Sequence, residues 1–493
     1  MGEALPPLFG RHHVAGPEHD HAPGSNTSAA SIAAMTAPQP GDAAGEPPGS
    51  SAAGSSSASS TASHSATPES TTGDIASRLV GWRHPSILAA AGLSVASGFA
   101  QYAVTASLAD VAAAFGEVTS TAPGASLAEQ VGLSTSRIGL GLAVIRLASL
   151  GSLPLTGLAD AHGRRRVLLL TCAAGLALTV TASLAPTYWA FVVIVALSRP
   201  LLSATNAVAG VTAAEEARSG DRAWALALIT AAYGIGAGLT TLVRVVGGDV
   251  LGFRPLFAFA LVPLLVLPLL RRVLVEPERF IRAASRAPQR LLLGPFRGRL
   301  RRRLAIVASM TFAVAFVTGP VNTYLFLYAE GVMGLGPGTT FAVVLAAGPT
   351  GLAGLLLGRW AADRLGRRPT AVTAHLGLAV FGVATYSGSV PLLIGGYLLS
   401  IFAGSLYAPA TGALSAELFP TSVRATSAGW LTVSSVAGGV LGLITFGVVA
   451  DLANSFAVAA LAVAVPAGLV SVTYLRLPET MGLELEDSAP EER

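Results

Sequence analysis

Residues 156–166 of this 493-residue chain read TGLADAHGRRR and lie between two long apolar segments. Residues 358–368 read GRWAADRLGRR and repeat the order of an Asp, two further residues, a Gly and a run of Arg. Asp363 stands 203 residues after Asp160 (363 − 160 = 203). Gly readily forms left-handed turns, and clustered Arg stays in water on one side of a bilayer. The repeated turn therefore predicts two homologous membrane halves.

The composition places the chain among membrane proteins that cross the bilayer many times. Of its residues, 52% are hydrophobic and only 12% are charged, whereas soluble domains are about a quarter charged. Cys172 is the only cysteine, which excludes an intramolecular disulfide and a cysteine-based metal site. The net charge of +4 follows from the placement of Arg around the spans, so we expect no nucleic-acid partner, metal or cofactor.

Twelve apolar spans are expected, and several have about 20 residues, enough to cross ~30 Å of hydrocarbon as helix. The spans are 86–108, 137–157, 167–185, 188–213, 223–245, 256–271, 304–328, 341–358, 369–388, 391–413, 427–450 and 456–475. The predicted fold is all-α, with two six-helix halves at 81–271 and 304–476. A disordered tail at 1–80, a basic linker at 272–303 and a short tail at 477–493 complete the expected organisation.

The distribution of Arg predicts the orientation of the chain. The loops on the side of the repeated turns carry most of the Arg, and segment 271–303 holds eleven Arg against Glu276 and Glu278. The loops on the other side carry only Arg137, Arg244 and Arg254. The positive-inside rule therefore predicts that both termini are cytoplasmic. The basic linker is either a solvated connection or a contact for anionic lipid head groups.

A second pair of loops repeats at the same interval. Glu215 and Arg222 follow the fourth span, and Glu417 and Arg424 follow the tenth, each 202 residues later (417 − 215 = 202 and 424 − 222 = 202). Two parallel six-helix repeats are an architecture of secondary transporters, in which the substrate site lies between the halves. We therefore expect a transporter and not an enzyme.

These motifs resemble the major facilitator superfamily, and within it the sugar porter and metabolite symporter branch. Residues 275–280 read VEPERF, where sugar porters carry Pro-Glu-Ser-Pro-Arg, and residues 478–482 read PETMG, where they end in Pro-Glu-Thr-Lys-Gly. The Gln pair of sugar porters is replaced by Phe316 and Val317, whereas the later positions Gly319, Asn322 and Tyr324 partly keep the pattern.

The resemblance implies a cytoplasmic gate that holds the halves together while the site faces outward. Asp160, Arg164, Asp363 and Arg367, together with the pairs Glu215/Arg222 and Glu417/Arg424, would form its charge pairs. The complete set of expected gate residues is Asp160, Gly163, Arg164, Arg165, Glu215, Arg222, Asp363, Gly366, Arg367, Glu417 and Arg424.

Polar residues deep in the apolar spans are the best sequence clue to a substrate site. Arg146, Arg199 and Gln101 reach a similar depth on spans two, four and one. The two Arg either bond to backbone carbonyls and reach for the surface, or they line an electropositive cavity for an anionic substrate. Asn322 and Tyr324 follow Gly319-Pro320, which we expect to break span seven; they either line the site or satisfy one another between helices.

The sequence thus predicts a secondary active transporter that moves a small polar solute by alternating access. An anionic metabolite and a sugar-like compound are the candidate substrates, and protons are the candidate coupling ion for symport. A drug or metabolite efflux transporter of the same fold and a membrane sensor without transport are the alternatives. We expect a monomer in the plasma (inner) membrane of a bacterium, in contact with anionic lipid at 271–303.

Overall fold

A computed structural model describes residues 81, 83–119, 125–218, 221–247, 252–277 and 298–481, all within one compact unit, Ala66–Arg493. Residues 1–80, most of the predicted linker and residues 482–493 lie outside the described residues. The side chains of Asp160, Arg222 and Arg424 are also outside the description. The expectations placed on these segments and side chains therefore stay predictions.

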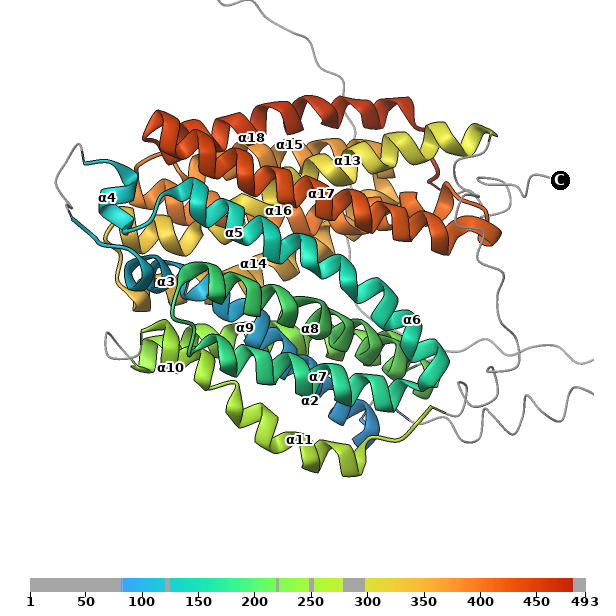
Figure 1. Cartoon of the computed structure of the whole chain (residues 1–493). Helices are drawn as coiled ribbons and strands as arrows, with labels where there is room; N and C mark the ends of the chain where they lie inside the picture. Colours follow the sequence, from blue (N-terminus) through green and yellow to red (C-terminus); the bar gives the residue numbers. More distant parts are fainter. Residues whose placement is uncertain are drawn as a thin grey trace, which may run out of the picture. The chain divides into compact units, whose positions relative to one another are not determined.

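The amino-terminal half is a set of helices joined by short turns (Figure 1). They are α2 (Pro85–Ala106), α3 (Leu108–Phe115), α4 (Leu127–Val131), α5 (Thr135–Ala148), η1 (Ser149–Gly151), α6 (Ser152–His162), α7 (Arg164–Ala182), α8 (Tyr188–Glu216), α9 (Arg222–Gly247), α10 (Phe253–Ala258) and α11 (Leu261–Val273). The second span continues through α5, η1 and α6 to His162, five residues beyond its predicted end.

The carboxy-terminal half repeats this plan without the small helices α3 and α4. It contains α13 (Gly298–Thr323), the π-helix η4 (Leu327–Val332), α14 (Pro337–Arg364), α15 (Arg367–Thr385), α16 (Val390–Glu417), α17 (Thr421–Ala453), α18 (Phe456–Val470) and η5 (Ser471–Arg476). Each half thus presents six long membrane-type segments in the described residues, which confirms the all-α fold class.

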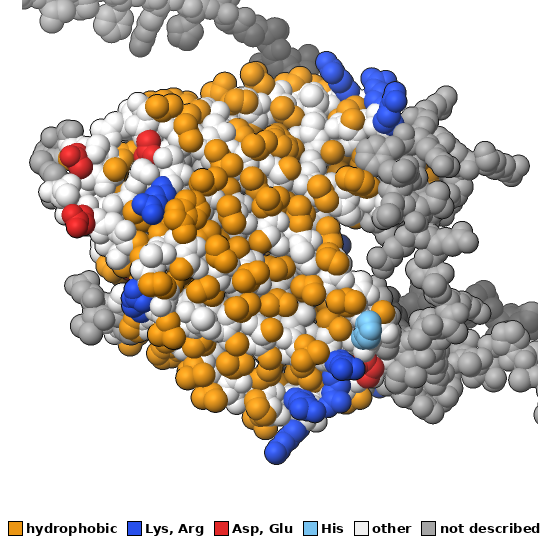
Figure 2. Space-filling view, viewed as in Figure 1, with side chains coloured by type: hydrophobic (Ala, Val, Ile, Leu, Met, Phe, Trp, Pro, Cys, Tyr) orange, Lys and Arg blue, Asp and Glu red, His pale blue; other side chains and the backbone are white. Residues whose placement is uncertain are grey.

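Eleven of these segments are long and apolar enough to cross a membrane. The exception is α15, which begins with Arg367 and Arg368 and contains His375. It packs against α16 and α18. Figure 2 shows apolar side chains over the middle of the molecule and charged side chains towards its two ends. We call the end with residues 162–166 and 364–368 the arginine-rich end, and the other end the opposite end.

Close helix packing shows the same twofold relation as the motifs. Gly236 of α9 lies against the carbonyl of Val95 on α2, where an added Cβ would be 2.0 Å from the oxygen. Gly438 of α17 lies against the carbonyl of Phe312 on α13, where the same distance would be 2.2 Å. The two glycines stand 202 residues apart (438 − 236 = 202). Only a residue without a Cβ allows the paired backbones to approach so closely.

The expected break of span seven at Gly319-Pro320 was wrong in its position. Helix α13 continues through Pro320 to Thr323, and the irregularity begins at Tyr324, before η4. Proline leaves the carbonyl four residues earlier without its helical donor. That carbonyl belongs to Phe316 and lies against Gly442 of α17, where an added Cβ would be 2.2 Å away. The glycine of the neighbouring helix therefore leaves room for the carbonyl that has lost its helical donor.

Candidate functional site

A small cavity of about 60 Å³ lies deep in the bundle and has walls from both halves. We call it the central cavity. Gln101, Arg146 and Arg199 line it from the amino-terminal half, and Gly319, Thr323 and Leu443 line it from the carboxy-terminal half. The three polar residues that the sequence placed at one depth are thus brought together at one cavity. Helices α2, α5 and α8 carry them, and α13 and α17 close the other side.

Gln101 is held in place by helix α8. Its Nε2 donates to Ser97 Oγ at 2.9 Å, and its Oε1 accepts from Ser203 Oγ at 3.3 Å. Ser97 Oγ in turn donates to the carbonyl oxygen of Leu202 at 2.8 Å. Arg199 donates from Nη1 to the backbone carbonyl of Gln101 at 3.3 Å. A partnered amide in a buried position is rigid, so this network fixes the floor of the cavity.

Arg146 connects the small cavity to a larger one. The larger cavity has a volume of about 540 Å³, and its walls come from α13, α16 and α17, with Arg146 as its contribution from the amino-terminal half. It extends to Ser415, Ala428 and Leu477, near the arginine-rich end of those helices. The Nε of Arg146 lies beside Gly439, where an added Cβ would be 3.2 Å from it.

The charged side chains that line the two cavities are all positive. Among the described residues that line them, Arg146 and Arg199 are the charged side chains, and none is Asp or Glu. The buried Nε atoms of both Arg have no hydrogen-bond partner within the described part of the chain. A buried guanidinium donor without a partner is unfavourable unless a ligand or water satisfies it. The arrangement can therefore accept an anion.

The opposite end is closed by an ion-pair cluster that joins the two halves. Arg244 of α9 donates to both carboxylate oxygens of Asp110 on α3, at 2.7 and 2.8 Å, and from Nη1 to Glu330 of η4 at 2.6 Å. The side chains of Arg244 and Glu330 are 7% and 8% exposed. We call Asp110, Arg244 and Glu330 the opposite-end clamp. Burial raises the pKa of the Glu330 carboxyl, although the hydrogen bonds and charge of Arg244 lower it.

A second contact at this end also crosses between the halves. Asp451 of α17 accepts hydrogen bonds from the backbone nitrogens of Thr135 and Ser136, both at 2.8 Å, at the start of α5. Asn454 Oδ1 accepts from the backbone nitrogen of Leu127 at 2.7 Å. A carboxylate at a helix N-terminus satisfies free N–H groups and the helix dipole. The carboxy-terminal half thus caps a helix of the amino-terminal half.

At the arginine-rich end, each half has its own charge network, and the two networks match. Arg164 donates from Nε and Nη2 to the two carboxylate oxygens of Glu215, both at 3.0 Å. Arg367 forms the same pair with Glu417, also at 3.0 Å, and donates to Asp363 at 3.3 Å. These pairs connect helices of the same half.

A glutamate just beyond each half caps the helix that follows the repeated turn. Glu276 accepts from the backbone nitrogens of Arg164 and Arg165. Glu479 accepts from those of Arg367 and Arg368, at 2.9 and 3.1 Å. Again the offset is 203 residues (479 − 276 = 203). Glu276 and Glu479, which belong to the segments that carried part of the resemblance to sugar porters, therefore cap these helices.

The glycine of each repeated turn is required by its backbone. Gly163 has φ +98° and ψ +142°, and Gly366 has φ +107° and ψ +155°. This region of backbone space is nearly restricted to glycine. An added Cβ would also lie 2.9 Å from Glu276 at the first turn and 2.9 Å from Glu479 at the second.

The remaining expected site residues lie elsewhere. Tyr324 is fully buried, and its hydroxyl donates to the carbonyl oxygen of Thr135 at 3.1 Å, so it joins the halves near the opposite end. Asn322 is partly buried, and its Oδ1 has no partner within the described residues. Neither residue lines the two cavities. The pairing of Glu215 and Glu417 with Arg222 and Arg424 stays a prediction.

Sequence reasoning missed the clamp and the cap formed by Asp451. Asp110 and Glu330 are separated by 220 residues (330 − 110 = 220), and neither belongs to the internal repeat. Acidic residues at the ends of apolar spans were the available signal, but such residues are common at membrane surfaces. Asp110 and Glu330 differ from other acidic residues at span ends only in that both contact Arg244.

A family model described as Major Facilitator Superfamily matches residues 90–359 and 339–489. The chain belongs to the major facilitator superfamily. A Cupriavidus pinatubonensis protein named as a probable 4-methylmuconolactone transporter is 26% identical over 374 residues, which cover 72% of this chain and 85% of the relative. The family consists of transporters, so this chain is a secondary transporter and not an enzyme.

Solved structures of the superfamily share the fold. The xylose transporter XylE from E. coli, in an inward-open conformation, aligns with a TM-score of 0.61 and 16% identity, over 82% of this chain and 98% of that chain. A D-xylose-proton symporter aligns with a TM-score of 0.62 and 20% identity, over 80% and 98%. At these identities, the likeness shows the fold alone.

Proposed function

We propose that this transporter carries a small anionic metabolite across the bacterial plasma membrane by alternating access. One observation carries the proposal: Arg146 and Arg199 line the central cavity, and no described lining residue is a carboxylate. A guanidinium pairs with carboxylate or phosphate through two parallel hydrogen bonds. A neutral sugar would leave both positive charges uncompensated in a site of low polarity.

The cavity geometry supports an inward-facing state. The clamp and Asp451 join the halves at the opposite end, while the larger cavity extends from Arg146 towards the arginine-rich end. By the positive-inside rule, we expect the arginine-rich end to face the cytoplasm. In our proposal, the substrate therefore reaches Arg146 from the cytoplasmic side in this conformation, and both termini lie on that side.

The relative named for 4-methylmuconolactone, at 26% identity, supports a metabolite as the cargo. Among the alternatives, drug efflux and a sensor have no separate observation in their favour. The expected charge pairs of the cytoplasmic gate, at Arg164, Arg367, Glu215 and Glu417, would rearrange when the arginine-rich end closes. Each Arg is paired within its own half here, as our proposal requires for an end that is open.

We also propose protons as the coupling ion, as in the D-xylose-proton symporter of the same fold, and Glu330 as a group whose protonation favours closure of the opposite end. No described carboxylate lines the cavities, so a coupled proton needs a carboxylate elsewhere in the cycle. Glu330 is buried where the halves meet, and this burial raises the pKa of its carboxyl, although Arg244 lowers it. Closure of the opposite end would therefore favour a proton on Glu330. That proton would come from the opposite end and return to it on reopening, so it makes closure depend on pH and is separate from the proton that crosses the membrane.

The test is transport in proteoliposomes with purified protein. 4-Methylmuconolactone and a series of small carboxylates are compared with neutral sugars such as xylose. We expect transport of anions, and Arg146→Gln or Arg199→Gln should raise KM roughly 10- to 100-fold, the effect of about 1.5–3 kcal/mol for a charge-assisted hydrogen bond. Arg137→Gln, an exposed arginine on the same helix as Arg146, is the matched control. Transport of neutral sugars alone, or unchanged KM in both variants, would contradict the proposal.

A further inference from the structure

A groove of about 630 Å³ lies between α7 and α11, away from the central cavities. Its walls are Leu169, Leu170 and Ala173 from α7, and Leu264, Leu267 and Pro268 from α11. None of the residues of α11 is buried, and Leu170 is 59% exposed. The groove is thus an apolar channel on the outer side of the amino-terminal half, and no side chain of the described residues fills it.

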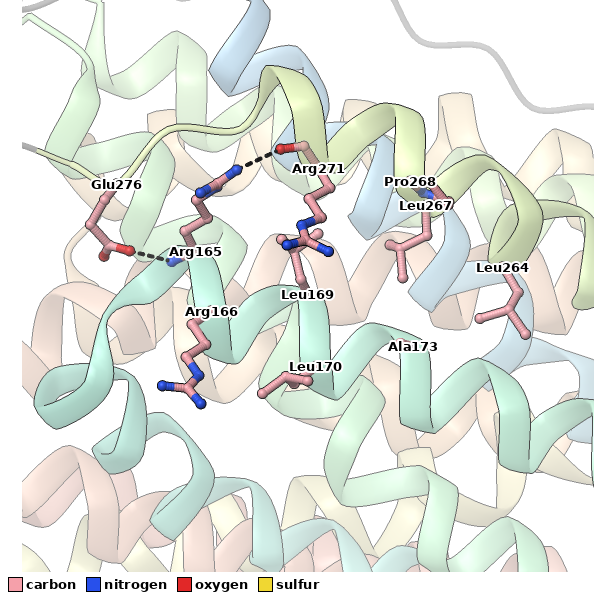
Figure 3. A pocket seen from close by; sticks show the side chains of 10 residues that line it. All are labelled: Arg165, Arg166, Leu169, Leu170, Ala173, Leu264, Leu267, Pro268, Arg271 and Glu276. Carbon is pink, nitrogen blue, oxygen red and sulfur yellow. Dashed lines mark hydrogen bonds between the residues drawn. The ribbon is translucent and has the colours of Figure 1, made fainter.

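Three arginines stand at one end of this groove. Figure 3 shows Arg165, Arg166 and Arg271 gathered beside the start of α7, with the leucines extending away from them. Arg166 and Arg271 are exposed. The arginines belong to the arginine-rich end, where a membrane helix leaves the hydrocarbon. The groove therefore combines apolar walls at membrane depth with positive charge at the level of the head groups.

The positive charge is not neutralised by the acid in the groove. Glu276 is the only carboxylate among the lining residues, and its two oxygens already accept the backbone N–H groups of Arg164 and Arg165. Arg165 donates from Nη2 to the carbonyl oxygen of Arg271 at 2.9 Å, and its buried Nε has no partner within the described residues. Three guanidinium groups thus face one carboxylate that is already engaged as a helix cap.

We propose that this groove binds an anionic phospholipid, with the head-group phosphate between Arg166, Arg271 and Arg165 and an acyl chain along the leucines of α7 and α11. Guanidinium groups bind phosphate oxygens in pairs of hydrogen bonds. Apolar wall residues continue beyond the arginines, from Leu169 to Ala173 on α7 and from Pro268 to Leu264 on α11, so an acyl chain could cover them whereas a soluble phosphate would leave them uncovered. The bound lipid would fill the space between α7 and α11 and connect them.

The other half lacks the same site, although its fold is equivalent. Arg165 and Glu276 have their counterparts in Arg368 and Glu479, but the position 203 residues after Arg166 is Pro369 (166 + 203 = 369). The position 203 residues after Arg271 is Tyr474 (271 + 203 = 474), which is buried at 1% exposure. Two of the three groove arginines, Arg166 and Arg271, therefore have no arginine 203 residues later in the carboxy-terminal half.

The test is native mass spectrometry of the full-length protein in detergent, titrated with phosphatidylglycerol or with phosphatidylcholine of the same acyl chains. Arg166→Gln/Arg271→Gln removes the head-group contacts, and Ala173→Leu fills the apolar part. Arg301→Gln/Arg302→Gln, two exposed arginines at the same end on α13, is the matched control. Glycerol 3-phosphate is a separate arm that distinguishes a lipid from a soluble organic phosphate. The melting temperature of each variant without added lipid verifies its folding.

We expect the wild type and the α13 control to retain phosphatidylglycerol over phosphatidylcholine. The arginine pair variant should bind it roughly 10- to 30-fold more weakly, since each arginine near an anionic head group contributes about 1 kcal/mol. Ala173→Leu should weaken it without a change in charge. Equal binding of the two lipids to the wild type would overturn the proposal. Undiminished binding of phosphatidylglycerol to both groove variants would overturn it as well. If millimolar glycerol 3-phosphate displaced phosphatidylglycerol, and Ala173→Leu bound phosphatidylglycerol like the wild type, the ligand of the groove would be a soluble phosphate and not a lipid.

Discussion

The two ends of the helix bundle use the same kinds of interaction for different purposes. At the opposite end, Arg244 binds one acid from each half, and Asp451 of one half caps α5 of the other. At the arginine-rich end, Arg164 and Arg367 bind acids of their own halves, and Glu276 and Glu479 cap the helices α7 and α15. Similar ion pairs and caps thus connect the halves at one end and stiffen each half at the other.

This difference explains which end is open. Helix α5 packs along α17, whereas its continuation, α6, packs on α7 and α8 of its own half, so the two halves separate along the chain towards the arginine-rich end (Figure 1). The larger cavity occupies that side. Interactions between the halves stabilise the closed end, and they must break before the site can face the other way.

The largest effect is expected for Arg244→Gln. It leaves Glu330 and Asp110 without their cation, and loss of one partner of a buried ion pair costs about 3–5 kcal/mol. The halves should then separate at the opposite end. The reporter is Thr323→Cys in a Cys172→Ser background, labelled by an impermeant maleimide applied to that end, because Thr323 lines the central cavity.

Arg137→Gln, on an exposed arginine of the same end, should label like the parent. If Arg244→Gln also labelled at the parental rate in a folded protein, the clamp would not hold the halves together.

The sharpest comparison of the two ends uses two acids with the same local role. Asp451→Asn and Glu276→Gln each remove one acceptor for a pair of backbone N–H groups, at a cost of about 1–3 kcal/mol. Asp451→Asn should increase labelling of Thr323→Cys, because its bonds cross between the halves. Glu276→Gln should lower the melting temperature with labelling unchanged. The same labelling response in both variants would refute the distinction between the ends.

A third prediction concerns the glycines of the repeated turns. Gly163→Ala and Gly366→Ala should each lose about 1–3 kcal/mol of stability, because their backbone conformation is nearly restricted to glycine. Gly157→Ala is the matched control: Gly157 lies in α6 with open space around its Cβ position, so alanine should stabilise its helix by up to about 1 kcal/mol. Melting curves in one detergent measure all three, and equal shifts would show that the turns tolerate a side chain.

The smallest effect is expected from pH at the opposite end. Burial in the closed form raises the pKa of the Glu330 carboxyl, with Arg244 and Thr340 lowering it and Asp110 raising it further. An open end would return Glu330 to water and to its ordinary pKa. The proton contribution to closure is therefore present at low pH and is lost as pH rises through the raised pKa.

Labelling of Thr323→Cys should accordingly increase as the pH at that end rises above the ordinary range of a carboxyl group. Glu330→Gln should remove this dependence. A pH profile that Glu330→Gln leaves unchanged would assign the proton to another group.

The internal repeat made most of the fold predictable. Asp160 and Asp363 fixed the interval between the halves, and apolar length fixed the helices. The three polar residues of the central cavity were found from their depth alone, since Gln101, Arg146 and Arg199 lie on adjacent helices. Helix ends were less predictable, because the helices extend beyond the hydrocarbon into polar residues such as Glu216 and Glu417.

The clamp could not be predicted, for a physical reason. Arg244, Asp110 and Glu330 follow no shared period, and their contact depends on which end of the transporter is closed. Tyr324 shows the same limit: its position after Gly319-Pro320 favoured a site residue, but its hydroxyl bonds to Thr135 of the other half. Contacts of this kind depend on the conformation and not on the local sequence.

In our proposal, Arg146 and Arg199 together bind an anion between the two ends of the bundle. The most direct measurement is equilibrium binding of the transported anion by calorimetry to the wild type and to Arg146→Gln/Arg199→Gln, with Arg137→Gln as the control. We predict that the double variant binds at least about 100-fold more weakly, the effect of two charge-assisted hydrogen bonds, whereas the control binds like the wild type. Equal affinity for the anion in a folded double variant would contradict the account.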